Sequence, residues 1–384
     1  MSEIETETKP ETKKISLKEK FKNWISTPTG KKQFIIIIVA VLILIAAGVS
    51  AYQLTREDKP TVVNNSKTVT PKLGDKAIDN TVVSKYDGLK YESSAANRAP
   101  ITVVVENHPD ARPQYGLSKA SIVFEAISEG GITRFLAVFG PQDAERIGPV
   151  RSARTYFLDW TEGLDAFFAH CGGNIDALDR IQKESIKDMD QFANSGAYWR
   201  DTSRKVASEH TLYTSTAKLY ELAKTKGWGT EANFEGYTYK DDPAEAQRPA
   251  SQTVDLTFSS AQFNVKYIYS PKDNSYARVL GGVAHKDAQT NEQIKVKNIS
   301  VIEVKRTAGL TRINESGYTM NTVGEGKATF FVDGKKIDGT WKKDSKTAMI
   351  KFSDSQGKVV EFSRGNMWIE VIPAGESSSS VTAQ

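Results

Sequence analysis

Charged and amide side chains follow the short apolar runs of this sequence, at the points where buried strands would end. Residues 101–105 are followed by Glu106 and Asn107, residues 121–124 by Glu125, and residues 166–170 end in His170. In a sheet whose strands alternate with helices, polar groups at the strand ends converge on one edge. We therefore predict a polar cleft there, lined by candidate ligand-binding side chains: Asn107, Arg112, Gln114, Arg134, Arg146, Arg151 and Arg154.

The segment around Arg151 and Arg154 has the composition of an anion site. Residues 147–150 contain Gly148-Pro149 and cannot continue a helix, so a helix is expected to begin near Ser152. Its apolar face has spacings of three and four residues, formed by Ala153, Tyr156, Phe157, Trp160 and Leu164. A helix start offers unpaired N–H groups, and two guanidinium groups beside it would hold an anion. The alternative is that these arginines are solvated or pair with nearby carboxylates, those of Asp143, Glu145 and Asp159.

Four side chains are candidates for acid–base chemistry: Glu106, Glu125, His170 and His210. A carboxylate such as Glu106 or Glu125 could act as a base or bind a divalent cation. The four histidines show no H-x-x-x-H or similar spacing, so the sequence predicts no metal site and no cofactor beyond such a cation. Cys171 is expected to pack as a small apolar residue, because His170 and Cys171 are strand neighbours that point to opposite faces.

An uncharged segment near the N-terminus has the length and composition of a transmembrane helix. No charged residue lies between Lys32 and Arg56, and residues 34–47 are entirely apolar. At roughly 1.5 Å per residue this run reaches about 35 Å, enough for a hydrocarbon core of about 30 Å. Lysine-rich residues precede it, so the positive-inside rule places the N-terminus in the cytoplasm and the rest outside. We predict a retained anchor at residues 34–51, bounded by Phe34 and Ala51; the alternative is a signal peptide cleaved near Ala51.

The composition limits the classes of partner. Hydrophobic residues make up 39% of the chain and charged residues 26%, as in globular proteins. The net charge is only +4, and most of it belongs to residues 1–32, so nucleic acid is not an expected partner. The single cysteine excludes an internal disulfide. The expected partners are the cell membrane and an envelope glycan or another anionic ligand.

Changes in composition along the chain predict seven segments. Residues 1–32 are a basic cytoplasmic N-terminus, 33–55 the transmembrane helix and 56–86 a flexible tether. In residues 87–240, strand-like runs at 101–105, 121–124, 133–139 and 166–170 alternate with helical patterns, the last of which begins at Ser215 and stops at Gly227; this predicts an α/β domain. Residues 241–251 are a linker, 252–373 a mostly antiparallel β domain with turn signals between short strands, and 374–384 a disordered tail.

Several motifs carry a resemblance to a known family. Residues 107–109 (NHP), 111–120 (ARPQYGLSKA), 129–135 (EGGITRF) and 148–154 (GPVRSAR) together resemble the YerB family of bacterial lipoproteins, and the likeness continues to about residue 373. The resemblance implies an extracytoplasmic, membrane-anchored, two-domain protein whose activity is not established. Two features depart from the family: a lipid-bearing cysteine is missing, so anchoring falls to residues 34–51, and Glu209-His210-Thr211 stands where Pro-His-Asn is expected.

Two functional hypotheses from different classes remain open. The first is a non-enzymatic binding protein of the cell envelope, whose arginine-rich cleft holds an anionic or glycan-like ligand or a partner. The second is an enzyme that acts on a phosphate-containing envelope substrate, such as a lipid-pyrophosphate-linked glycan, with arginines on the phosphates and Glu106 or Glu125 as base. The ligand hypothesis is favoured because no recognisable catalytic motif accompanies the arginines.

Overall fold

The computed structural model describes residues 22, 24–29, 32–33, 80–376 and 379–384. The chain divides into two units, Met1–Ala77 and Ile78–Gln384. In the first unit residues 24–26 are helical, and the Thr27 hydroxyl donates to the Trp24 carbonyl oxygen at 2.8 Å. Within the described ranges, no helix is both long and apolar enough to cross a membrane. The predicted membrane segment, from residue 34 onward, lies outside these ranges, as does the predicted tether up to residue 79.

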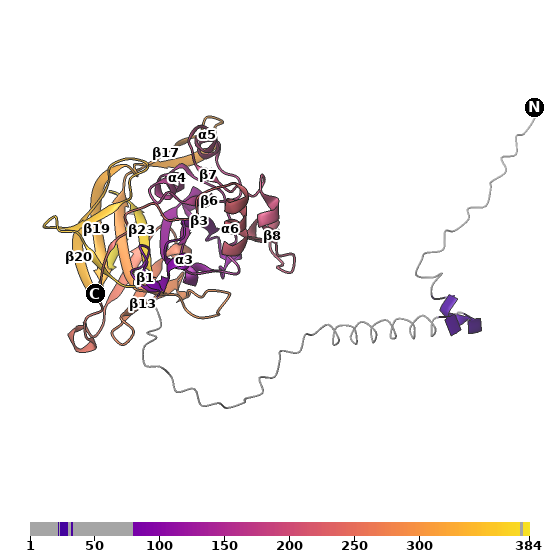
Figure 1. The fold of residues 1–384 in the computed structure, drawn as a ribbon, viewed down its shortest axis with the longest axis horizontal. Coiled ribbons are helices and arrows are strands. Elements are labelled where there is room, and N and C mark those ends of the chain that lie inside the picture. The colour runs from indigo at the N-terminus through magenta and orange to yellow at the C-terminus, as the bar shows by residue number, and fades with distance from the viewer. Residues whose placement is uncertain (1–21, 23, 30–31, 34–79, 377–378) are drawn as a thin grey trace, which may run out of the picture. The chain divides into compact units, whose positions relative to one another are not determined.

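A large mixed sheet runs through the second unit and contains strands from both predicted domains (Figure 1). The strand β23 (Met367–Pro373) joins the strands of the two predicted domains. It pairs in parallel with β16 (Asn298–Val304) on one side and with β4 (Ile122–Ile127) on the other. The order of the sheet is β21 (Lys351–Asp354), β20 (Lys335–Lys343), β19 (Gly324–Val332), β16 (Asn298–Val304), β23 (Met367–Pro373), β4 (Ile122–Ile127), β5 (Thr133–Phe139), β3 (Ile101–Glu106), β6 (Phe167–Ala169) and β7 (Lys187–Asp188).

A second sheet packs on one face of the large sheet. Its strands are β14 (Val283–Ala284), β13 (Ser275–Leu280), β12 (Val265–Ser270), β11 (Thr253–Thr257) and β24 (Ser380–Ala383), and β15 (Lys295–Val296) also pairs with β13. The remaining pairs are β1 (Thr81–Val83) with β2 (Lys90–Glu92), β8 (Trp199–Arg200) with β9 (Leu212–Tyr213), β10 (Thr238–Lys240) with β22 (Glu361–Ser363), and β17 (Arg306–Leu310) with β18 (Ser316–Met320). The α-helices within residues 80–376 are α3 (Ser93–Ala96), α4 (Thr155–Glu162), α5 (Ile175–Lys183) and α6 (Thr216–Thr225).

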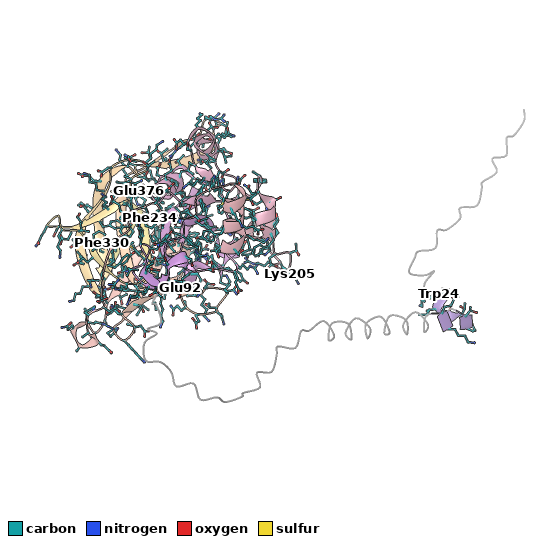
Figure 2. All side chains as sticks on the ribbon, in the orientation of Figure 1. Trp24, Glu92, Lys205, Phe234, Phe330 and Glu376 are labelled. Atoms are coloured by element: carbon teal, nitrogen blue, oxygen red, sulfur yellow. The ribbon has the colours of Figure 1, made fainter. Side chains whose placement is uncertain are left out.

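The large sheet has a hydrophobic core on each face, because successive side chains of a strand point in opposite directions. On β3, Val103 and Val105 join the core that contains Val265 and Tyr267 of the second sheet. Val104 belongs to the opposite core, with Phe157 and other side chains of α4. Figure 2 shows Phe330 among the strands and Lys205 on a loop at the periphery. Strands buried on both faces explain the nearly continuous apolar runs in the sequence.

The predicted elements of residues 87–240 are mostly confirmed, but the α/β fold class holds only in part. The segment 133–139 is β5, and α6 begins after its N-cap Ser215. The structure as a whole is mostly β with few helices, and β5 is antiparallel to both β3 and β4. The connection from β4 to β5 is only residues 128–132, which is too short for the crossover that parallel neighbours require.

The structure also corrects three predicted boundaries. Residues 80–86 of the predicted tether are folded, since Thr81–Val83 is a strand and the Tyr86 side chain is fully buried. In the predicted disordered tail, Ser380–Ala383 forms β24 on the edge of β11, because half-buried Val381 packs against the core. The two predicted domains share the large sheet, so they form one unit in space rather than two bodies on either side of the 241–251 segment.

Candidate functional site

The predicted site residues converge at the end of the large sheet, but they divide between its two faces. Glu106 and Asn107 are consecutive, and they therefore point in opposite directions. Glu106 lies opposite Arg134 in the register of β3 and β5, so these two side chains share a face. Asn107 instead lies beside Glu125 on the face that packs against the second sheet. The single predicted cleft is therefore two separate clusters.

The cluster on the first face is built around Glu106, whose side chain is almost completely buried. Glu106 Oε2 accepts a hydrogen bond from His210 Nδ1 at 2.8 Å, and Oε1 lies 3.0 Å from Arg151 Nε. The Arg151 contact is an ion pair without hydrogen-bond alignment. The other end of the Arg151 guanidinium donates to the more exposed Glu209 at 3.3 Å. The fold thus joins two predicted catalytic candidates, Glu106 and His210, to a predicted ligand-binding arginine.

Arg134 and Arg154 lie on the same face and share the carboxylate of Glu129. Arg134 contacts Glu129 Oε2 at 3.0 Å, and Arg154 donates to Oε1 through a short hydrogen bond. Glu129 lies on the tight β4–β5 connection, where Gly130 and Gly131 both have positive φ. Burial alone would raise the pKa of Glu129, but the Arg154 hydrogen bond and the charges of both arginines outweigh it and lower that pKa to about 2. The predicted anion position near the start of α4 therefore holds a carboxylate from the protein itself.

The cluster on the second face is a buried polar network between the two sheets. Glu125 Oε2 accepts a short hydrogen bond from Arg278 of β13, while Oε1 accepts from Thr133 at 2.6 Å and from Asn107 at 3.2 Å. Three further side chains extend this network. Gln114 donates to Asn107 Oδ1 at 2.9 Å and accepts from His285 at 3.0 Å. His285 accepts from Arg278 at 2.5 Å, and Tyr267 donates to Glu370. All of these side chains are fully or almost fully buried, which indicates a structural role for Glu125.

Two carboxylates face one arginine in this network, and the second carboxylate is neutralised by protonation. Burial and the nearby Glu125 carboxylate raise the pKa of Glu370 well above its usual range. Burial and the Arg278 charge lower the pKa of His285 well below its usual range, so this ring is neutral. The balanced set is Arg278 with Glu125, with Glu370 protonated beside them.

The wild-type chain is expected to lose stability as the pH rises above 4.5, because of the raised pKa of Glu370, and Glu370→Gln is expected to abolish this loss. Below the ordinary pKa of 4.5, Glu370 is protonated in both the folded and the unfolded state. Above it, only the unfolded state loses the proton, so the wild-type free energy of unfolding falls by up to about 1.4 kcal/mol per pH unit until the folded pKa is reached. Urea unfolding at pH 5 and pH 8 measures this, with the exposed Glu361→Gln as control. Equal pH slopes for Glu370→Gln and wild type would contradict the assignment.

The remaining predicted residues have partners of their own. The Arg146 guanidinium lies between the rings of Tyr115 and Tyr213 and pairs with Asp201 at 2.5 Å. Arg112 donates to the side-chain and backbone oxygens of Asn107, both at 3.0 Å, and burial lowers its pKa to about 10. Both ring nitrogens of His170 lie 2.7 Å from acceptors, the Gly172 carbonyl oxygen and Asp188, so neither is free for acid–base chemistry. A cavity of about 830 Å³ lies beside α3 and α6, and none of the predicted ligand-binding residues lines it.

Sequence reasoning missed several members of both clusters. Arg278, His285 and Glu370 are distant in sequence from the first predicted domain and show no motif. Glu129 had a usable signal, because it precedes a Gly-Gly turn between two strands and faces Arg134 across that turn. The prediction of no metal site considered spacing along the chain only, whereas the fold brings His108, Asp110 and His210 together, with one possible ligand atom from each within 4.8 Å of the others.

Comparison with known proteins identifies relatives over most of the second unit. Residues 87–229 match the "Protein of unknown function (DUF3048) N-terminal domain", and residues 254–369 match the corresponding C-terminal domain. The "Putative lipoprotein YerB" of Bacillus subtilis (strain 168) is 33% identical over 299 residues, covering 76% of this chain and 86% of that protein. The crystal structure of the YerB protein from Bacillus subtilis superposes with a TM-score of 0.69 at 31% identity, covering 78% of this chain and 99% of that one.

Proposed function

The chain belongs to the YerB (DUF3048) family, and from this membership we propose that it is an extracytoplasmic binding protein held at the cell membrane. The family resemblance in the sequence is confirmed, and the matched relative is named "Putative lipoprotein YerB". This chain has no cysteine at the end of its apolar segment that could carry a lipid. We therefore propose residues 34–51 as the membrane anchor, with the N-terminus in the cytoplasm.

The proposed ligand site is the arginine cluster of the first face, formed by Arg134, Arg151 and Arg154. The observation that carries the proposal is the crowding of like charges: burial, together with repulsion from Arg154 and Arg151, lowers the pKa of Arg134 to about 10. Like-charged groups held close in a half-buried site stabilise a bound anion, and guanidinium forks match phosphate and carboxylate geometry. We therefore propose an anionic group on an envelope ligand, such as the phosphate of a glycan.

Three carboxylates contact the three arginines in the structure, and two of them, Glu129 and Glu209, are the more exposed members of their pairs. The Glu129 side chain is 37% exposed and that of Glu209 is 55% exposed, whereas that of Glu106 is only 4% exposed. The Arg151–Glu209 ion pair is exposed and contributes little to stability, so a ligand anion could displace Glu209 at low cost. Displacing Glu129 costs more, because two buried arginines hold it and lower its pKa to about 2. Glu106 would stay in place and hold Arg151 from its other side.

Substitutions at Glu129 and Arg151 are expected to change anion affinity in opposite directions. Arg151→Ala is expected to weaken the binding of inorganic pyrophosphate by at least about tenfold, because a hydrogen bond to a charged group contributes about 1.5–3 kcal/mol. Glu129→Gln is expected to tighten it by about tenfold, because the ligand no longer has to displace a charged competitor. Isothermal titration calorimetry of the detergent-solubilised full chain, in metal-free buffer of low ionic strength, measures both.

The matched control is Arg312→Ala, which removes an exposed arginine that pairs with Asp179 on a different part of the surface. It is expected to bind pyrophosphate like wild type. A purely structural role for Glu129 would give weaker or unchanged binding in Glu129→Gln, and either result would count against displacement of this carboxylate. If the wild-type chain binds no pyrophosphate, the proposal of an anion site is wrong.

An enzyme acting on a phosphate-containing envelope substrate is the second candidate. It is favoured by the 2.8 Å hydrogen bond between Glu106 and His210, a buried carboxylate–imidazole pair beside Arg151. Turnover of a lipid-pyrophosphate-linked glycan in the presence of Mg²⁺, abolished in Glu106→Gln, would distinguish catalysis from binding.

A further inference from the structure

The geometry points to a zinc site formed by His108, Asp110 and His210, next to the proposed anion site. Each residue offers one ligand atom, and these atoms lie within 4.8 Å of one another. The inference rests on the proposed function, because Glu106 contacts both the arginine cluster and His210. It adds a metal ion, which the arginines cannot bind. The residues come from two short 3-10 helices that are far apart in sequence. His108 is the N-cap of Pro109–Ala111, which contains Asp110, and His210 is the last residue of Ser208–His210.

His210 is already oriented as a metal ligand. A carboxylate can only accept, so Nδ1 is the ring nitrogen that donates in the 2.8 Å contact with Glu106, and Nε2 is the nitrogen left to face an ion. Both side chains are almost completely buried, which fixes the ring in this orientation. In zinc sites the non-ligating ring nitrogen of a histidine usually donates its N–H to an outer-shell partner such as a carboxylate. In the structure Glu106 has this position.

The two ligand-bearing turns are tied together by Arg204. Its guanidinium donates to the Asp110 carbonyl oxygen at 2.8 Å and to the His210 carbonyl oxygen at 3.1 Å. It also donates to the Tyr213 hydroxyl at 2.6 Å, which anchors it to β9. The His108 and His210 rings stack with their centroids 4.9 Å apart and their planes 10° apart. The backbone positions of all three proposed ligands are thus set before any ion binds.

Two of the ligands must move to close around an ion, and His108 then gives up its stack on His210 and the 3.2 Å hydrogen bond that its Nδ1 accepts from the Asp110 N–H. In a tetrahedral zinc site with bonds of about 2.0–2.1 Å, ligand atoms lie about 3.3–3.4 Å apart. The separations here reach up to 4.8 Å, so closure needs a side-chain movement of about 1.4 Å. The side chains of His108 and Asp110 are 34% and 61% exposed, and rotation of these two provides that movement while His210 stays fixed.

The donor set favours zinc over magnesium or calcium. Two imidazole nitrogens and one carboxylate suit Zn²⁺, whereas Mg²⁺ and Ca²⁺ prefer sets of oxygen ligands. Three protein ligands leave the fourth position open, as in zinc sites that bind a further ligand. Glu106 connects the zinc site to the arginines, because one of its carboxylate oxygens contacts His210 and the other contacts Arg151. An anion held by Arg151 could therefore complete the zinc coordination.

Zinc titration of the full chain tests this site. The chain is purified in detergent without a polyhistidine tag and freed of metal, and Zn²⁺ is titrated in competition with a chromophoric chelator, with no pyrophosphate present. Wild type is expected to bind one equivalent, and His108→Asn and Asp110→Asn are each expected to lose at least about tenfold in affinity. Glu106→Gln keeps all three ligands and is expected to lose about 10–100-fold, the typical effect of removing an outer-shell partner.

The control is Asp338→Asn, an exposed carboxylate that pairs with Lys336 on β20, and its zinc affinity is expected to equal that of wild type. Asparagine can replace His108 as the N-cap that accepts from the Asp110 N–H, so His108→Asn should fold, and circular dichroism checks this. Equal zinc affinity in wild type and His108→Asn, or no stoichiometric uptake by wild type, would overturn the proposal. Pyrophosphate binding in metal-free buffer tests the anion site separately, so either site can fail while the other stands.

Discussion

Arg278→Met is expected to lower the free energy of unfolding by about 3–5 kcal/mol, the usual cost of leaving a buried charge without its partner. Arg278 is fully buried, donates to Glu125, and lies 4.3 Å over the ring of Trp368. Methionine fills a similar volume but offers no donor, so the Glu125 carboxyl group would lose its charged partner between two sheets. Urea unfolding followed by far-ultraviolet circular dichroism measures the loss.

A second substitution separates the charge effect from the loss of packing. Glu125→Gln in the Arg278→Met background removes the uncompensated carboxylate and is expected to recover part of the lost stability. The same Glu125→Gln change in the wild-type chain should instead destabilise, because it removes the carboxylate that Arg278 contacts most closely. This change of sign between backgrounds is the signature of a charge pair. An Arg278→Met chain as stable as wild type would show that the pair contributes nothing.

The sequence predicted individual elements well because their boundaries have local causes. The β5 strand is a run of apolar and β-branched residues between Gly131 and Gly140, and it was predicted to the residue. The α6 helix begins after the hydroxyl of Ser215, which accepts from the Lys218 N–H, and it ends before Gly227. The wider architecture has no such local signal. The apolar runs that form β23 and β4 do not reveal that these two strands, more than 200 residues apart in sequence, would lie side by side.

The candidate site was predicted as a set of residues but not as an arrangement. The sequence placed Glu106 and Asn107 together at a strand end, yet strand alternation sends them to opposite cores. The alternative to the anion site, that Arg154 pairs with a carboxylate, holds in kind, but the partner is Glu129, which is 25 positions away, rather than Asp143, Glu145 or Asp159. His108 and His210 are about 100 positions apart, so their stacked rings could be found only in the folded chain.

Trp368→Ala is expected to lower the free energy of unfolding by about 3–5 kcal/mol, the typical range for a large aromatic side chain removed from a core. Trp368 is fully buried on β23, opposite Ile299 of β16 and Val123 of β4. Its ring contacts Phe135 edge to face, with the centroids 5.5 Å apart. The cavity would therefore open where the two sequence halves meet, and the loss should appear equally in circular dichroism and in tryptophan fluorescence.

Trp368→Phe is the matched control, and it is expected to cost clearly less. The smaller ring keeps much of the apolar contact, and it removes the indole Nε1–H, which is buried without a hydrogen-bond partner. Because β23 pairs with a strand from each half, cooperative unfolding should persist in both variants as one transition. If Trp368→Ala instead unfolded in two steps, with residues 80–240 and 252–376 melting separately, the shared sheet would not be what couples the halves.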